Sequence, residues 1–205
     1  MTFQWDLIAR NWPVLLQGLW VTLAVAAVGL TIAILGGALI CAARAVIAFF
    51  RITPEVVLIF WAYFCIPLIT GWRVSGFWAG SVTLGLIGAA YLAEIFRGGI
   101  ETVPKGQNEA AMALGLPPYP RWRKIVLPQA LRFSVPPLVN YFTEFLKNTT
   151  LLSAIGVSEL SLQAYLLGGQ TFRYVEFLTA IALVYFALIF PFSLLSRRLE
   201  LRHAG

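Results

Sequence analysis

The stretch EAAMALG at residues 109–115, followed by IVLP at 125–128, decides how the rest of the chain is read. It belongs to a short polar and basic island, rich in proline, that lies between long apolar segments. Alanines let another backbone approach a helix closely, Gly115 can end that helix, and the prolines that follow prevent its continuation. Residues 104–128 therefore predict a compact helical hairpin on which a partner can dock. The alternative is an ordinary amphipathic loop helix with basic side chains.

The composition places much of this chain in lipid. Of its 205 residues, 60% are hydrophobic and 12% are charged, and the mean hydropathy is +0.81. Soluble domains are about half apolar and about one quarter charged, and a chain this short cannot bury so much apolar surface in its own core. The net charge of +6 does not indicate nucleic acid, because the basic residues are divided among short loops, as in membrane proteins with basic cytoplasmic segments.

Five apolar segments are long enough to cross a bilayer, which takes about 20 helical residues. We expect an all-α integral membrane protein with a single domain over 1–205. The expected spans are about 15–41, 46–70, 77–97, 130–152 and 174–197, and the loop 104–128 joins the third to the fourth.

Two further segments are expected at the outer side. Residues 3–18 contain tryptophans, which favour the membrane interface. Residues 158–167 predict a short helix, for which Ser158 can serve as the N-cap.

The distribution of Lys and Arg predicts the orientation. If the N-terminus is extracytoplasmic, eleven of the fifteen basic residues fall on the cytoplasmic side. The four others are Arg10, Arg73, Lys147 and Arg173. We therefore expect the island and the C-terminus in the cytoplasm.

The island resembles the EAA loop of ABC-importer permeases. In that pattern, EAA-x3-G-x9-I-x-LP, nine residues separate Gly115 from Ile125, and this chain matches at every defined position. The resemblance implies a short coupling helix that fits into a cleft on an ATP-binding subunit and transmits its motion to the spans. The residues that it assigns to coupling are Gln107, Glu109, Ala110, Ala111 and Gly115.

Four shorter sequence runs indicate a particular subgroup of these permeases. AYLAEIFRGGI at 90–100 with VPKGQ at 103–107, and KNTTL at 147–151 with IGVSEL at 155–160, are similar to the polar amino-acid uptake permeases, the histidine, glutamate, glutamine, arginine and opine group. The resemblance implies a type I ABC importer permease fold in a bacterial inner membrane. Its implied partners are ATP-binding subunits, an extracytoplasmic amino-acid-binding protein and a second permease subunit, identical or different.

Polar residues in the fourth span are the expected substrate contacts. The family's frequent Asp after the lysine is Asn148 here, while Glu144, one turn earlier, keeps a carboxylate on the same helix face. A zwitterionic amino acid needs acceptors for its ammonium group and donors for its carboxylate. The expected contacts are Glu144, Asn148, Thr149, Thr150 and Ser153. The alternative is that Glu144 and Lys147 pair with other spans and touch no substrate.

Three charged residues are expected to be structural or gating. Glu55 follows Pro54 and suits the positive end of a helix at the cytoplasmic rim, with a role in an inner gate as the alternative. Glu94 and Arg97 are three residues apart, which permits a salt bridge on the third span.

The sequence offers no catalytic residues, metal site or resident cofactor. No Walker motif occurs, so ATP is expected to bind to a separate subunit. The only histidine, His203, lies in the C-terminal tail, and this argues against a membrane-embedded enzyme. The expected function is the permease subunit of an ATP-driven importer of polar amino acids or opine-like compounds. The alternative is an ATPase-independent channel or secondary transporter, although such proteins often contain inverted repeats that this chain lacks.

Overall fold

The computed structural model describes residues 4–40 and 44–203, and this part of the chain is helical without any strand. The helices are α1 (Trp5–Ile40), α2 (Arg44–Ile52), α3 (Glu55–Phe60), α4 (Ile66–Thr70), α5 (Gly76–Thr102), α6 (Lys105–Ala113), α7 (Pro118–Arg121), α8 (Leu127–Asn148), α9 (Leu160–Thr171) and α10 (Tyr174–His203). Two π-helical segments, η1 (Trp61–Cys65) and η2 (Trp122–Val126), and one 3-10 segment, η3 (Thr149–Ile155), continue the helices beside them.

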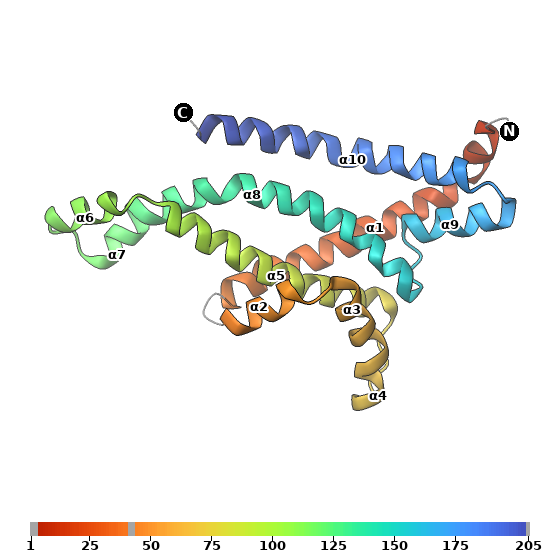
Figure 1. Ribbon diagram of the computed structural model, residues 1–205, viewed down its shortest axis with the longest axis horizontal. Helices are drawn as coiled ribbons and strands as arrows, with labels where there is room; N and C mark the ends of the chain where they lie inside the picture. The colour runs from red at the N-terminus through yellow and green to blue at the C-terminus, as the bar shows by residue number, and fades with distance from the viewer. Residues whose placement is uncertain (1–3, 41–43, 204–205) are drawn as a thin grey trace.

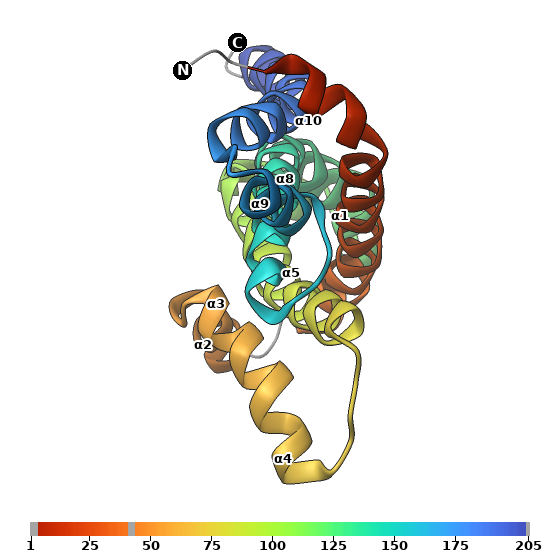
Figure 2. The ribbon, with the colours of Figure 1, turned by 90° about the vertical axis from the view of Figure 1, so that its right-hand side faces the viewer.

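The long helices α1, α5, α8 and α10 run along the molecule, as Figure 1 shows. Helices α6 and α7 form one end, towards which the C-terminal end of α10 also points, and α9 lies at the opposite end with the start of α1. Helices α3 and α4 project away from this bundle (Figure 2). The island and the C-terminal helix therefore end on the side opposite to the start of α1, which is the arrangement that the basic residues predict. The side of the membrane on which each end lies stays a prediction.

Three helices are each long and apolar enough to cross a membrane. They are α1 over Trp5–Gly37, α5 over its whole length and α10 over Tyr174–Arg198. Two bent pairs pass the same test together, α2 with α3–α4 and Pro118–Ile155 with α9. The described chain thus contains three to five candidate spans, and the expected number of five is reached when each bent pair counts as one.

The segment expected as the second span is divided at Pro54. Helix α2 ends at Ile52, and the pair α2 and α3–α4 is bent by 100°. Pro54 precedes α3 with φ −56° and ψ 130°. A proline lacks the N–H group needed to continue α2 and disfavours helical geometry in the residue before it, so the apolar stretch 46–70 does not form one straight helix.

The first span begins earlier than expected. Residues from Trp5 onward are continuous with α1, because Ile8 and Leu15 pack in a cluster with α9 and α10. The N-terminal segment is therefore part of the first long helix, not a separate helix on the surface. The expected end of this span, at residue 41, lies outside the described residues.

Helices α1 and α5 approach each other closely, because small residues line their contact. A Cβ atom on Gly85 would lie 2.6 Å from Cβ of Ile32, and one on Gly88 would lie 2.7 Å from Cβ of Ala33. Such contacts between small residues are how helices pack where the hydrophobic effect is weak. The fully buried Phe145 of α8 joins the same core. This packed core holds the helices that carry the functional residues.

Candidate functional site

Helix α6 begins after Pro104 and ends in a Schellman turn. The N–H of Leu116 donates to the carbonyl of Ala111 (3.1 Å), and the N–H of Gly115 donates to that of Met112 (2.9 Å). Gly115 has φ +71°, and a Cβ atom there would meet nothing within 4 Å. The glycine is therefore needed for its left-handed backbone and not for close approach to a neighbour.

The five residues expected to couple divide into two groups. Gln107, Glu109, Ala110 and Gly115 are exposed at the end of the molecule. Ala111 is buried and so faces the rest of the chain. The structure thus makes four of the five available to a partner, while Ala111 holds α6 in place.

Large apolar side chains lie uncovered around α6 and α7. Met112 is 50% exposed, Leu114 81%, Tyr119 70% and Trp122 46%. A hollow of about 330 Å³ lies beside Tyr119 and Trp122. Because exposed apolar patches mark interaction sites, these four residues with the exposed face of α6 form a candidate docking surface, which we call the α6–α7 surface.

One uninterrupted helical run connects this surface to the polar residues of the fourth span. It extends from Pro118 to Ile155 through α7, η2, α8 and η3. Its first residues belong to the α6–α7 surface, and its last turns contain Lys147, Thr150 and Ser153. The two sets of predicted functional residues therefore lie near the two ends of the same helical run.

Glu144 and Lys147, near the C-terminal end of α8, form an ion pair on the surface of the subunit. Lys147 Nζ lies 2.8 Å from Glu144 Oε2, and their side chains are 52% and 57% exposed. Lys147 and Thr150 line a cavity of about 510 Å³ between α8 and α10, together with Tyr185 and Ser193. A cation and hydroxyl groups thus border one space that is large enough for an amino acid.

The other predicted substrate contacts are less open. Thr149 is fully buried, and its hydroxyl donates to the carbonyl of Leu146 at 2.7 Å. The hydroxyl of Ser153 donates to the carbonyl of Thr150, also at 2.7 Å. Asn148 and Ser153 are half-buried. The structure brings Lys147 and Thr150 together, whereas Thr149 has no surface within the isolated subunit.

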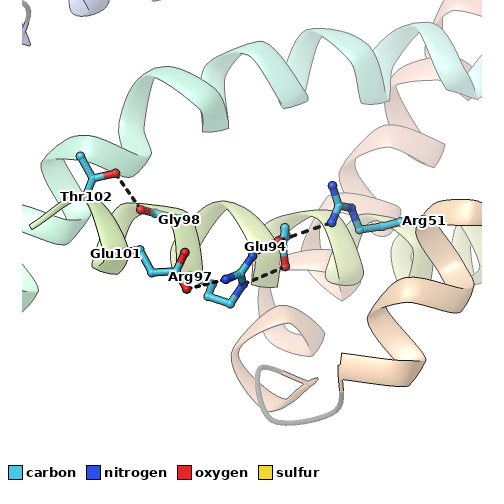
Figure 3. A network of polar contacts seen from close by, with 6 residues as sticks. All are labelled: Arg51, Glu94, Arg97, Gly98, Glu101 and Thr102. Atoms are coloured by element: carbon cyan, nitrogen blue, oxygen red, sulfur yellow. Dashed lines mark hydrogen bonds and ion pairs between the residues drawn. The ribbon is translucent and has the colours of Figure 1, made fainter.

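The predicted pair of Glu94 and Arg97 is part of a larger network, drawn in Figure 3. Arg97 Nε donates to Glu94 Oε2 at 3.1 Å, and the same guanidinium group also pairs with Glu101. Arg51 of α2 approaches Glu94 at 3.6 Å and lies over the ring of Tyr91, 5.4 Å from its centroid. The predicted salt bridge was local to α5, whereas the observed network also connects α2 to α5 through Arg51.

Glu55 is the first residue of α3, as its predicted place at a helix N-terminus requires. Its Oε2 atom is buried and has no hydrogen-bond partner among the described residues. A buried carboxylate oxygen without a partner is costly, so Glu55 is not explained by the contacts of the described residues.

Sequence reasoning placed Glu159 in the first turn of α9 and missed its role as the N-cap, fully buried at the start of that helix. Its carboxylate accepts hydrogen bonds from the N–H groups of Ser161 (2.9 Å) and Leu162 (2.8 Å), so Glu159 caps the helix in place of the predicted Ser158. The hydroxyls of Thr22 in α1 and Tyr185 in α10 donate to the same carboxylate at 3.5 and 3.3 Å. Glutamate is not a preferred N-cap, and its partners lie 137 and 26 residues away, so no local pattern could indicate this cluster.

Comparison with known sequences gives a consistent set of relatives. Residues 25–204 match the family described as binding-protein-dependent transport system inner membrane component. The glutamine transport system permease protein GlnP of Escherichia coli (strain K12) is 35% identical, over 98% of this chain and 98% of its own length. The arginine transport system permease protein ArtQ of Bacillus subtilis (strain 168) is 32% identical, over 92% of this chain and 91% of its own.

Solved structures show the same fold. A chain from the crystal structure of an amino acid ABC transporter with histidines aligns with a TM-score of 0.90 and 32% identity, over 98% of this chain and 100% of that one. A chain of the MetNI methionine ABC transporter in an inward-facing conformation aligns with a TM-score of 0.66 over 93% of this chain and 98% of that one. At 24% identity, this second likeness concerns the fold alone.

Proposed function

This chain belongs to the family of binding-protein-dependent transport system inner membrane components, and we propose that it is the permease subunit of an ATP-driven ABC importer of polar amino acids or opine-like compounds. The names of its relatives, a glutamine and an arginine permease, support amino acids as the substrate class. Their nearly full-length coverage supports the same subunit role and the type I importer fold.

The proposed topology has five spans, with each bent pair counted as one. The N-terminus is extracytoplasmic, and the α6–α7 surface and the C-terminus are cytoplasmic, because eleven of the fifteen basic residues then lie inside. Single cysteines at Gln107 and Gln4 test this topology with a membrane-impermeant thiol reagent. Labelling of the Gln107 position from outside intact cells would overturn it.

We propose that the α6–α7 surface docks on an ATP-binding subunit. Exposed apolar side chains beside the polar residues Gln107 and Glu109 give it the mixed character of a transient interface. ATP would bind to and be hydrolysed by that partner, since this sequence has no Walker motif. The remaining proposed partners are an extracytoplasmic amino-acid-binding protein and a second permease subunit.

The observation that carries this function is the continuous helical run from Pro118 to Ile155. A coupled transporter needs a physical connection by which a partner's state biases the substrate site, and one helical run shared by both sites provides it. A channel or secondary transporter would have no use for an uncovered docking surface at one end of such an element.

The proposed substrate contacts are Glu144, Asn148, Thr149, Thr150 and Ser153. The ion pair of Glu144 and Lys147 is already complementary to an amino acid, because a substrate ammonium group can replace Lys147 at Glu144 while the substrate carboxylate binds Lys147. Such an exchange keeps every charge paired at membrane depth, where an unpaired charge is costly. A guanidinium or side-chain ammonium group could use Glu144 in the same manner.

Uptake by Glu144→Gln in the reconstituted complex tests this assignment. We expect the apparent affinity for basic amino acids to fall about ten-fold or more, because one charged hydrogen bond is lost. Glu101→Gln is the matched control, since Glu101 is also an ion-paired glutamate on the surface, 60% exposed. Wild-type affinity of Glu144→Gln for every basic, acidic and amide amino acid would place the substrate site elsewhere. If Glu101→Gln still shows ATP-dependent uptake, the importer function stands, and only the position of the substrate site is wrong.

A further inference from the structure

A pocket lined by arginines lies where α2 crosses α5. Its volume is about 250 Å³. The lining residues are Arg44, Ile47, Ala48 and Arg51 of α2 with Ala93, Glu94 and Arg97 of α5. We propose that this pocket binds the phosphate of an anionic phospholipid headgroup.

The first argument is that positive charge in the pocket exceeds negative charge. Arg97 pairs with both Glu94 and Glu101, and Arg51 approaches the same Glu94. Two guanidinium groups therefore share two carboxylates, and Arg44 adds a third positive charge to the pocket. Arg44 is exposed and interacts with Glu94 only at longer range, forming no ion pair within the described residues. The adjoining residues 41–43 are Cys, Ala and Ala, which carry no carboxylate.

The second argument is the two-sided character of α2. Its arginine-bearing face lines the pocket, whereas Phe49 and Phe50 line an apolar cavity of about 470 Å³ formed with α3, α4 and α5. By the helical period, these two sets of side chains lie on opposite sides of α2. A helix with one basic and one aromatic face is typical of the membrane interface.

The third argument is the position of the pocket along α5, and it rests on the proposed topology. Glu94 and Arg97 lie in the last three turns of α5, which ends at Thr102, shortly before α6 begins at Lys105. In the proposed topology this is the cytoplasmic end of the span. The lining arginines are therefore near the depth of the lipid phosphates, and Phe49, 57% exposed, lies on the other side of α2.

Phosphate suits these residues chemically. Guanidinium groups bind phosphate through two parallel hydrogen bonds, and basic pockets between spans on the cytoplasmic side bind anionic headgroups. A bound headgroup would also brace α2, whose other contacts with α5 are the apolar cluster of Ile47 with Ala90 and Ala93 and the network around Glu94. Lipid binding should therefore raise the stability of the subunit.

The test uses the full chain in nanodiscs of phosphatidylcholine alone or mixed with phosphatidylglycerol. Retained lipid is measured by native mass spectrometry, and stability by thermal unfolding. We expect phosphatidylglycerol to be retained and to raise the unfolding midpoint. Arg44→Gln should weaken its binding about five-fold, which is the effect of one basic residue near an anionic surface. Arg44 is chosen because it has no described ion pair whose loss would disturb the fold.

Two controls separate the pocket from general surface charge. Arg132→Gln removes an exposed arginine of α8 that does not line the pocket, and it should bind phosphatidylglycerol as the wild type does. Arg44→Lys keeps the positive charge but loses the planar guanidinium group that can form two parallel hydrogen bonds. It should therefore bind phosphatidylglycerol with intermediate strength. Equal lipid retention by Arg44→Gln and the wild type, or equal losses in Arg44→Gln and Arg132→Gln, would overturn the proposal.

A free anion is distinguished from a lipid by competition. Soluble glycerol phosphate should neither displace phosphatidylglycerol nor stabilise the protein in phosphatidylcholine nanodiscs. If it does both, the pocket is a site for soluble phosphate and the lipid assignment is wrong. No transport is measured, so this test can fail while the proposed importer function stands.

Discussion

The two ends of this molecule are held in opposite ways. At the α9 end, a buried carboxylate joins three helices, since Glu159 accepts hydrogen bonds from the start of α9 and from Thr22 and Tyr185. At the α6 end, most side chains are exposed, and the shape is fixed by backbone geometry at Pro104 and Gly115. The α9 end is held by residues that are distant in the sequence. The α6 end leaves its side chains exposed, so that another subunit can contact them. Substitutions at the first should therefore reduce stability, and substitutions at the second should reduce transport.

The largest loss of stability is expected for Glu159→Ala. The change removes a helix cap and leaves the Thr22 and Tyr185 hydroxyls without their acceptor, which together should cost about 3 kcal/mol of unfolding free energy. The thermal unfolding midpoint of the purified subunit in detergent measures this. Glu109→Ala on α6 is the control and should unfold as the wild type does. If both variants unfold at the wild-type midpoint, the cluster does not hold the α9 end.

A smaller loss is expected where α1 and α5 approach most closely. Gly88→Val places a side chain 2.7 Å from Cβ of Ala33 and should cost about 2 kcal/mol through overpacking. Gly98→Val, in the same helix, is the control, because a Cβ atom at Gly98 meets nothing within 4 Å. The difference between the unfolding midpoints of Gly88→Val and Gly98→Val measures the cost of overpacking. Equal midpoints would show that α1 and α5 are not closely packed at Gly88.

At the α6 end, two glycines should respond with opposite signs. Gly115→Ala forces an alanine to φ +71° and should cost about 1 kcal/mol. Gly106→Ala, inside α6, should add up to about 1 kcal/mol, because alanine favours the helix. A Cβ atom at either glycine meets nothing within 4 Å, so the backbone alone decides the result. Thermal unfolding of the two variants side by side tests this, and a shift of the same sign would refute the assignment of the turn.

The smallest effect on stability, with a large effect on transport, is expected for Glu109→Lys. The side chain is exposed, so unfolding free energy should change by less than about 0.5 kcal/mol. Uptake by the reconstituted complex should nevertheless fall, because the charge at the α6–α7 surface is reversed. Substrate-stimulated ATP hydrolysis by the partner subunit is the second readout. Normal uptake and normal ATP hydrolysis by Glu109→Lys would show that Glu109 does not take part in coupling.

Features with local causes could be predicted from the sequence. The turn at Gly115 follows from a glycine and the prolines after it, and the pair of Glu94 and Arg97 follows from a spacing of three. The break at Pro54 also has a local cause, but the apolar stretch 46–70 predicted one straight span. The missing N–H group and fixed φ of proline bend the chain there, although the stretch is largely apolar.

Features with distant causes could not be predicted. The partners of Glu159 come from α1 and α10, and only the packed structure brings them together. The burial of Thr149 likewise depends on its neighbours in space, since its sequence position on a polar stripe suggested an accessible hydroxyl. For the same reason the arginine pocket of α2 and α5 has no signature in the sequence.

The changes of winding in the run Pro118–Ile155 have a mechanical consequence. The 22 residues of α8 lie between a wider π turn at η2, beside the α6–α7 surface, and a tighter 3-10 segment at η3, beside Lys147. Both departures from α geometry mark places where a helix can change its number of residues per turn. If η2 tightened while η3 loosened, α8 would turn about its own axis like a driven shaft, with both ends staying in place. Such a turn would reorient the Glu144 and Lys147 side chains, and it would require the core around the buried Phe145 to repack.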